Sequence, residues 1–163
     1  RIVFDGVNDY VTGNSSSLSD FTVSYAINSS TVNSALIYYP LGLNFSGSAF
    51  GGGVYFGGTF SSQTTGIYDG TNTVSSSITV SANAWYIITA TRTSNTGSIY
   101  INGILRNTGS VATSSVLNYN IGRRTDDVWY FSGSISAVQI YNRALSQQEV
   151  QQNYNALKSR FGL

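Results

Sequence analysis

The chain has 163 residues, no cysteine and no histidine, and only 9% of its residues are charged, with a formal net charge of +1. Without cysteine there is no disulfide or thiolate metal site, and without histidine there is no imidazole for zinc or triad chemistry. The scarcity of cations argues against nucleic acid as a partner, because phosphate binding needs clustered Lys and Arg.

The length fits one domain, residues 1–163, which can bury roughly 70% of its unfolded surface. No apolar run approaches the ~20 residues that span a bilayer, so we expect no membrane insertion. The strand-like segment 2–4 follows Arg1 directly, without a signal peptide. We therefore expect the chain to be a piece of a longer exported or particle-borne protein.

Short runs of β-branched and aromatic residues recur along the chain between Gly, Asn, Asp and Ser, which is typical of a sandwich or barrel. The strongest runs are 21–27, 34–43, 54–60, 85–93, 98–101 and 135–141. Apolar side chains alternate from Phe21 to Ile27, which predicts that one face of this strand lies in a core. The glycine-rich stretch 50–58 predicts a bulged or curved strand pair, since neither a helix nor a Lys follows it as in a phosphate-binding loop.

Turn signals separate these runs. Asp69-Gly70, Asn95-Thr96-Gly97 and Asn102-Gly103 are places where the backbone can adopt positive φ. Because Asn102-Gly103 joins two apolar runs, it predicts a hairpin with Tyr100 and Leu105 on adjacent antiparallel strands.

One helix is expected, near the end of the chain. Ser146 and Glu149 have the spacing of a capping box, in which each side chain bonds the backbone of the other residue. Val150, Tyr154 and Leu157 then recur at helical spacing, and Gly162 follows as a stop signal.

Four groups of segments together resemble the laminin-G-like jelly-roll domain of the concanavalin A-like lectin and glucanase superfamily. They are FDGVNDYV at 4–11, WYIITATR at 85–92 with YING at 100–103, IGR at 121–123, and FSGSI at 131–135 with YNRALS at 141–146. The tail EVQQNYNAL at 149–157 is similar to the ending of such domains in structural proteins of phages. The resemblance implies an all-β, two-sheet antiparallel jelly-roll sandwich with one short C-terminal helix.

Each segment also has a structural explanation that needs no family. Asp5-Gly6 and Asn8-Asp9 predict a tight loop between two strands, and Trp85 at the start of a strand predicts a large core residue rather than a sugar platform.

Hydrolysis is not expected. A glycosidase needs two carboxylates about 5–10 Å apart across the scissile bond. The acids here are Asp5, Asp9, Asp20, Asp69, Asp126, Asp127 and Glu149. The single Glu lies in a helix cap, and the catalytic strand of the superfamily, two Glu flanking an Asp, has no counterpart. We expect a protein that is not an enzyme.

No cofactor is required by these residues, although the resemblance leaves calcium possible. Related domains hold calcium with Asp side chains and carbonyls in loops at the edge of the sandwich. The candidates are Asp69 in one loop and Asp126 or Asp127 in another, with solvated turn carboxylates as the alternative. Ser134, Ser136 and Ala137 stand where many relatives carry acids, which weakens the calcium hypothesis.

Glycan recognition needs aromatic faces and a few planar polar groups on a preformed surface. The segment richest in both is 123–130, with Arg123, Arg124, Asp126, Asp127, Trp129 and Tyr130. The alternative is a loop of Arg–Asp pairs with its tryptophan against the sandwich edge. A second candidate is a sheet face of Tyr38, Tyr39, Tyr55 and Tyr68, although tyrosines on strands are more often ordinary cover.

Two functions follow as hypotheses. The first is a carbohydrate-binding module on an extracellular or virion surface, with glycan or polysaccharide as its partner in host or surface attachment. The second is a structural or decoration module whose main contacts are protein neighbours in a particle or appendage. The fold alone does not choose between them.

Overall fold

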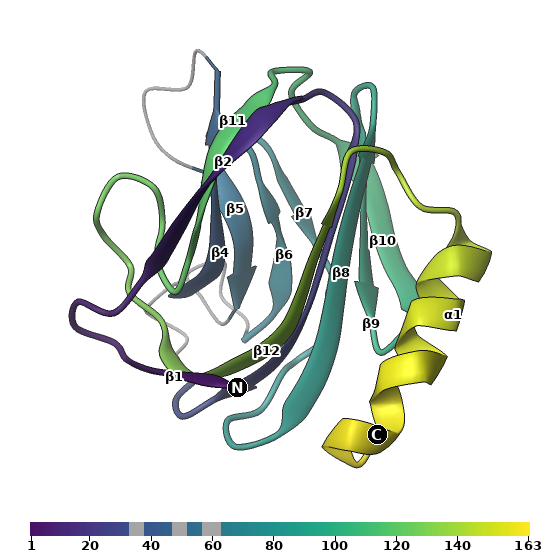
Figure 1. Ribbon diagram of the computed structural model, residues 1–163. Helices are drawn as coiled ribbons and strands as arrows, with labels where there is room; N and C mark the ends of the chain where they lie inside the picture. The colour runs from purple at the N-terminus through teal and green to yellow at the C-terminus, as the bar shows by residue number, and fades with distance from the viewer. Residues whose placement is uncertain (33–37, 47–51, 57–62) are drawn as a thin grey trace.

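The computed structural model describes residues 1–32, 38–46, 52–56 and 63–163. In this part, two antiparallel six-stranded sheets face each other (Figure 1). Sheet A contains, in spatial order, β1 (Ile2–Asp5), β12 (Ser132–Tyr141), β3 (Phe21–Ser29), β8 (Trp85–Thr93), β9 (Thr96–Ile101) and β10 (Ile104–Ser110). Sheet B contains β2 (Val11–Leu18), β11 (Val116–Ile121), β4 (Tyr38–Phe45), β5 (Gly52–Phe56), β6 (Thr65–Tyr68) and β7 (Thr73–Ser75).

The predicted fold class is confirmed, together with several local predictions. Leu105 pairs with Tyr100 across the Asn102-Gly103 hairpin, and both turn residues have positive φ. Gly70 has positive φ in the β6–β7 turn. Between β8 and β9, however, positive φ falls on Ser94, and Gly97 lies within β9. The strand predictions for 34–37, 50–51 and 57–60 lie outside the described residues.

The inner faces of the two sheets form one apolar core. Phe21, Val23, Tyr25 and Ile27 of β3 are all buried in it, as their alternation predicts. Sheet B contributes alternate residues of β4 and β5, including Leu41, Leu43, Phe45, Val54 and Phe56.

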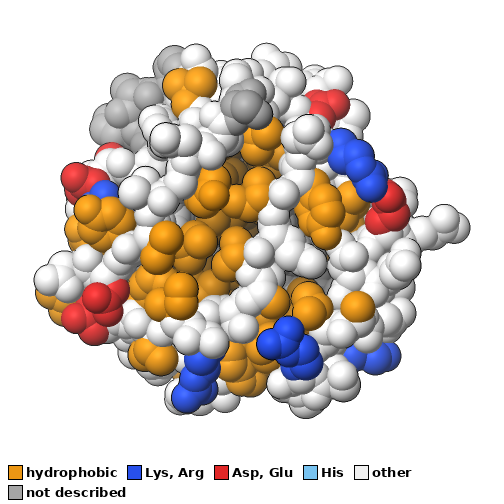
Figure 2. Space-filling view, in the orientation of Figure 1, with side chains coloured by type: hydrophobic (Ala, Val, Ile, Leu, Met, Phe, Trp, Pro, Cys, Tyr) orange, Lys and Arg blue, Asp and Glu red, His pale blue; other side chains and the backbone are white. Residues whose placement is uncertain are grey.

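The two seams of the sandwich differ. At the β7–β10 seam, the Asn107 side chain donates to the Ser75 carbonyl (2.7 Å). At the opposite side the sheets leave a hollow of 310 Å³, where Figure 2 shows apolar side chains gathered at the surface. Its lining residues are Arg1, Ile2, Ile121, Ile135, Ser136, Ala137 and Val138. Because β1 pairs only with residues 132–135 of β12, the hollow lies beside a part of β12 that pairs with β3 on one edge and with no described strand on the other.

The helix α1 (Gln147–Leu157) continues into a 3₁₀ turn, Lys158–Phe161, which Gly162 ends with positive φ. None of the helices in the described part of the chain is long and apolar enough to cross a membrane. Val150 packs with Tyr100 and Leu145 against the outer face of sheet A. Tyr154 lies directly over Gly103, where a Cβ would come within 2.9 Å of the ring.

The predicted capping box is present and is extended by an arginine. Glu149 accepts from the Ser146 backbone N–H (2.8 Å), and the Ser146 hydroxyl accepts from the Glu149 N–H (3.3 Å). Arg143 binds both carboxylate oxygens at 2.9 and 2.6 Å. The Arg143 hydrogen bonds, followed by the Ser146 N–H, lower the pKa of Glu149 to about 2.

This shift predicts a loss of stability in acid. The pKa of Glu149 rises from about 2 in the folded chain to its ordinary value of 4.5 on unfolding. The capping contribution is therefore complete above pH 4.5 and is lost as the pH falls toward 2. Urea unfolding at a series of pH values should show a shallower decline for Glu149→Gln than for the wild type. Parallel declines would contradict this prediction.

The environment of Trp85 differs from the prediction, which places it in the core. It is half-buried, and its ring packs on Phe161 of the C-terminal turn at a centroid distance of 4.7 Å. The local pattern of β8 could not reveal this partner, because Phe161 is 76 positions away along the chain.

Arg92 is an unexpected member of the interior, since it is only 1% exposed. Its guanidinium lies 4.9 Å from the ring centre of Phe21 and 5.6 Å from that of Phe45. It donates to four backbone carbonyls, those of Leu18, Ser19, Ala112 and Ser114. One cation therefore links the β2–β3 turn to the segment between β10 and β11.

Tyr25 carries a buried hydroxyl that has no hydrogen-bond partner among the described residues. Burial raises its pKa well above 10.0, so the phenol stays neutral. An unpaired buried polar group costs about 1–3 kcal/mol. We expect Tyr25→Phe to raise the free energy of unfolding by about 1 kcal/mol in urea titrations, because it removes this cost.

The matched control is Tyr86→Phe. The Tyr86 hydroxyl accepts from the Ser81 N–H at 3.0 Å, so its removal should lower stability. Equal losses in the two variants would contradict the prediction for Tyr25.

Candidate functional site

The 123–130 loop connects β11 to β12 and is the green loop at the left of Figure 1. Hydrogen bonds fix its backbone: the Arg124 N–H donates to the Val128 carbonyl (3.1 Å), and the Tyr39 N–H donates to the Trp129 carbonyl (3.3 Å). Gly42 of β4 lies beneath the loop, where a Cβ would collide with the Arg123 and Arg124 backbone. A glycine on β4 therefore lets the loop lie directly on sheet B.

Arg123 lies at the centre of an aromatic cluster. Its guanidinium lies 3.4 Å from the ring centre of Tyr10, and it donates to the Tyr130 hydroxyl (3.3 Å). It also forms an ion pair with Asp127 at 2.7 Å. The arginine thus connects the loop to the β1–β2 connection, from which Tyr10 comes.

Arg124 faces sheet B. It binds Asp126 through two parallel hydrogen bonds of 2.6 and 2.5 Å, a geometry that favours strong pairing. The hydrogen bonds to Asp126 raise the pKa of Arg124 despite its partial burial. The guanidinium also lies 5.6 Å from the ring centre of Tyr39.

The structure brings three of the four predicted tyrosines together with this loop. Tyr39, Tyr55 and Tyr68 come from the neighbouring strands β4, β5 and β6, and burial raises the pKa of Tyr39, an increase that Arg124 partly offsets. Tyr39 and Tyr55 are buried, and the half-buried Tyr68 donates to the Gly70 carbonyl (2.8 Å). Tyr39 lies beside Arg124, and because Tyr39 and Tyr55 are buried the three tyrosines do not form an exposed surface. Tyr38 differs from the prediction, because it packs against the core cluster.

The surface above this layer is aromatic and apolar. The exposed fraction is 36% for Trp129, 40% for Val128 and 45% for Tyr10. Tyr10 and Val128 were not among the residues that the sequence singles out. The pairing of Arg123 with Tyr10 spans 113 positions, so only the fold places Tyr10 at the site. Exposed aromatic and apolar side chains beside a carboxylate suit the C–H and hydroxyl groups of a sugar.

The calcium candidates do not converge. Both oxygens of the buried Asp69 accept from N–H groups, those of Thr71, Asn72 and Ala112. Burial alone raises its pKa, but these hydrogen bonds outweigh burial and lower it. Asp126 and Asp127 are paired with arginines, and no group of three or more acidic side chains suited to a metal occurs among the described residues. This geometry favours structural roles for the three carboxylates.

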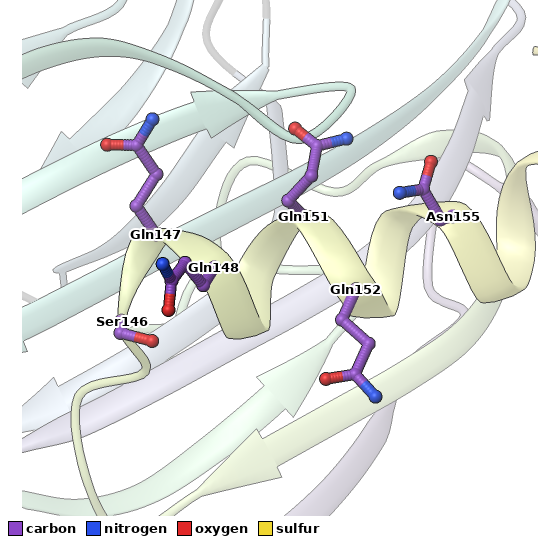
Figure 3. A pocket seen from close by; sticks show the side chains of 6 residues that line it. All are labelled: Ser146, Gln147, Gln148, Gln151, Gln152 and Asn155. Atoms are coloured by element: carbon purple, nitrogen blue, oxygen red, sulfur yellow. The ribbon is translucent and has the colours of Figure 1, made fainter.

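A separate surface, which is polar, runs along α1 (Figure 3). A broad open hollow there is lined by Ser146, Gln147, Gln148, Gln151, Gln152 and Asn155. All six come from one helix and its N-cap, without an aromatic face. The 123–130 loop with Tyr10 is therefore the stronger candidate for sugar contact.

The two-sheet antiparallel sandwich has the fold of the concanavalin A-like lectin/glucanase class. Residues 5–151 match the Laminin_G_3 family, described as the Concanavalin A-like lectin/glucanases superfamily. The chain belongs to this family. A comparison with curated proteins finds no match.

Solved structures similar to this chain share its fold at low identity. A heptameric SAP-like pentraxin from Limulus polyphemus has a TM-score of 0.72 at 17% identity, with 91% of this chain and 78% of that chain covered. Domain 4 of the arabinanase AbnA from Geobacillus stearothermophilus, in complex with arabinotriose, has a TM-score of 0.71 at 12% identity, with 91% and 85% covered.

A third structure is described as that of a carbohydrate binding protein from Bacteroides ovatus. Its TM-score is 0.72 at 15% identity, with 93% of this chain covered. This chain spans 47% of the length of that protein.

Proposed function

We propose that this domain is a non-catalytic carbohydrate-binding module, displayed on a virion or cell-surface protein for host or surface attachment. The observation that carries the proposal is the exposure of Tyr10, Val128 and Trp129 around a loop whose two arginines are fixed by ion pairs, with Arg123 packed on the ring of Tyr10. Such a preformed aromatic surface binds sugars without ordering flexible side chains first. The arabinotriose-bound and carbohydrate-binding relatives support this choice.

The absence of catalysis is part of the proposal. Glycoside hydrolysis needs an acid and a second carboxylate free to face the scissile bond. Asp126 and one oxygen of Asp127 are engaged by arginines, Asp69 by N–H groups and Glu149 by the helix cap. These engagements support a binding module over a hydrolase.

A microarray of polysaccharides and oligosaccharides tests the proposal. The expected result is selective binding of one sugar type by the intact domain. If the domain binds no sugar on the array and sediments as a tight homo-oligomer, the proposal is overturned.

A structural module making mainly protein contacts is the second candidate function. The observation that favours it is the apolar hollow at the open seam, beside the exposed Ile2 and Val3 of β1. Apolar surface of this kind is common where proteins meet. Glycan binding would leave this hollow unaffected, whereas assembly would cover it.

A further inference from the structure

We infer that the 123–130 site selects uncharged sugars and discriminates against acidic ones such as uronates or sialic acids. The inference rests on the proposed function and adds the chemical class of the ligand. It follows from the state of the four charged residues in the loop.

Both cations of the loop are already neutralised. Arg123 is paired with Asp127 at 2.7 Å, and Arg124 is paired with Asp126 at 2.5 Å. Two arginines and two aspartates leave the loop with no net charge. The arginine side chains are also poorly accessible, with exposed fractions of 12% and 15%. An acidic sugar would have to displace a carboxylate from one of them before it could form an ion pair.

The accessible charge at this surface is negative. The side chain of Asp127 is 70% exposed and lies next to the exposed Val128 in the loop. Its Oδ1 faces Arg123, whereas Oδ2 makes no hydrogen bond to a described residue. An approaching sugar carboxylate therefore meets a like charge, and two like charges about 4 Å apart in water weaken binding by roughly fivefold.

A neutral sugar meets no such penalty. Its C–H face can lie on Trp129 or Tyr10, and a hydroxyl can donate to Oδ2 of Asp127 while Oδ1 stays paired. Hydrogen bonds to ionised acceptors are the stronger kind, so this carboxylate favours hydroxyl-rich ligands. The same residue thus attracts neutral sugars and repels acidic ones.

The experiment uses pairs of oligosaccharides that differ only by oxidation of C6 to a carboxylate. The wild type should bind the neutral member at least about fivefold more tightly, the factor expected for one like-charge contact. Its affinity for the neutral member should be independent of salt from about 20 mM to about 500 mM, a range over which exposed charges become screened.

Asp127→Asn provides the decisive variant. It removes the exposed negative charge and frees Arg123, so it should strengthen binding of the oxidised member by about tenfold and make that binding salt-sensitive. Asn tolerates the positive φ of 64° at this position, so the loop should keep its conformation. The control is Asp20→Asn, which changes the net charge equally in the β2–β3 turn. Its side chain can still accept from the Ser94 N–H, and sugar selectivity should not change.

The outcomes separate this inference from the proposed function. A wild type that prefers the oxidised sugar in a salt-sensitive manner overturns the inference while leaving a glycan-binding module. Binding of both members equally, with no change in Asp127→Asn, also overturns it. If the domain binds no sugar of either kind, the proposed function and the inference are overturned together.

Discussion

Arg92→Ala should lower the free energy of unfolding by about 3 kcal/mol or more, because it removes the shared donor of four backbone carbonyls, that of the buried Leu18 and those of the less buried Ser19, Ala112 and Ser114. Because the Arg92 side chain is only 1% exposed, the carbonyl of the buried Leu18 loses a partner that water cannot easily replace. The packing of the guanidinium between Phe21 and Phe45 is lost at the same time. A loss of this size is a large part of the 5–15 kcal/mol typical of natural domains. Urea unfolding followed by tryptophan fluorescence measures it.

Two variants make this result specific. Arg92→Lys keeps the positive charge but lacks the planar guanidinium that donates to several carbonyls at once. It should therefore lower the free energy of unfolding by a substantial part of the same amount. Arg106→Ala removes an exposed arginine from β10 and should change stability by less than about 0.5 kcal/mol. If Arg92→Ala were as stable as Arg106→Ala, the buried arginine would not hold the sandwich together.

Trp129→Ala should weaken glycan binding by at least roughly thirtyfold, which corresponds to about 2 kcal/mol. Tryptophan at the centre of a binding surface supplies a large rigid contact area, and its neighbours cannot replace it. Because Trp129 is 36% exposed and contributes its carbonyl to the Tyr39 N–H, truncation of its ring should leave the fold intact. Calorimetric titration with the best sugar from the array measures the affinity.

The second tryptophan of the chain is the matched control. Trp85 packs on Phe161 away from the 123–130 loop, so Trp85→Ala should lower the melting temperature and leave sugar affinity unchanged. The two variants are thus expected to have opposite phenotypes. Unfolding by Trp129→Ala would instead identify this residue as a structural contact, and unchanged binding and stability would place the site elsewhere.

The strands and the helix cap were predictable because their signals are local. Alternation from Phe21 to Ile27 and the Ser146–Glu149 spacing depend on residues a few positions apart. The environment of Arg92 was not predictable, since its acceptors come from residues 18–19 and 112–114. In the sequence it stands between two threonines on a strand, which is equally typical of an exposed position.

The candidate site was predictable in its parts but not in its assembly. In the sequence, the residues of the 123–130 loop and the tyrosines of β4, β5 and β6 form two separate candidate sites. The order β11-β4-β5-β6 in sheet B and the turn of the loop over Gly42 bring Arg124 and Tyr39 together. Strand order follows from long-range packing, so no local pattern shows that one cluster supports the other.

The position of β12 between β1 and β3 also has a consequence for biosynthesis. β1 and β3 emerge early from the ribosome, yet they pair with each other only through the strand that ends at Tyr141. Until translation passes that residue, β1 has no neighbour in sheet A and one edge of β3 stays open. Non-local pairing of this kind folds slowly and exposes strand edges to other chains. Sheet A of this domain can therefore close only after the residues up to Tyr141 have been synthesised.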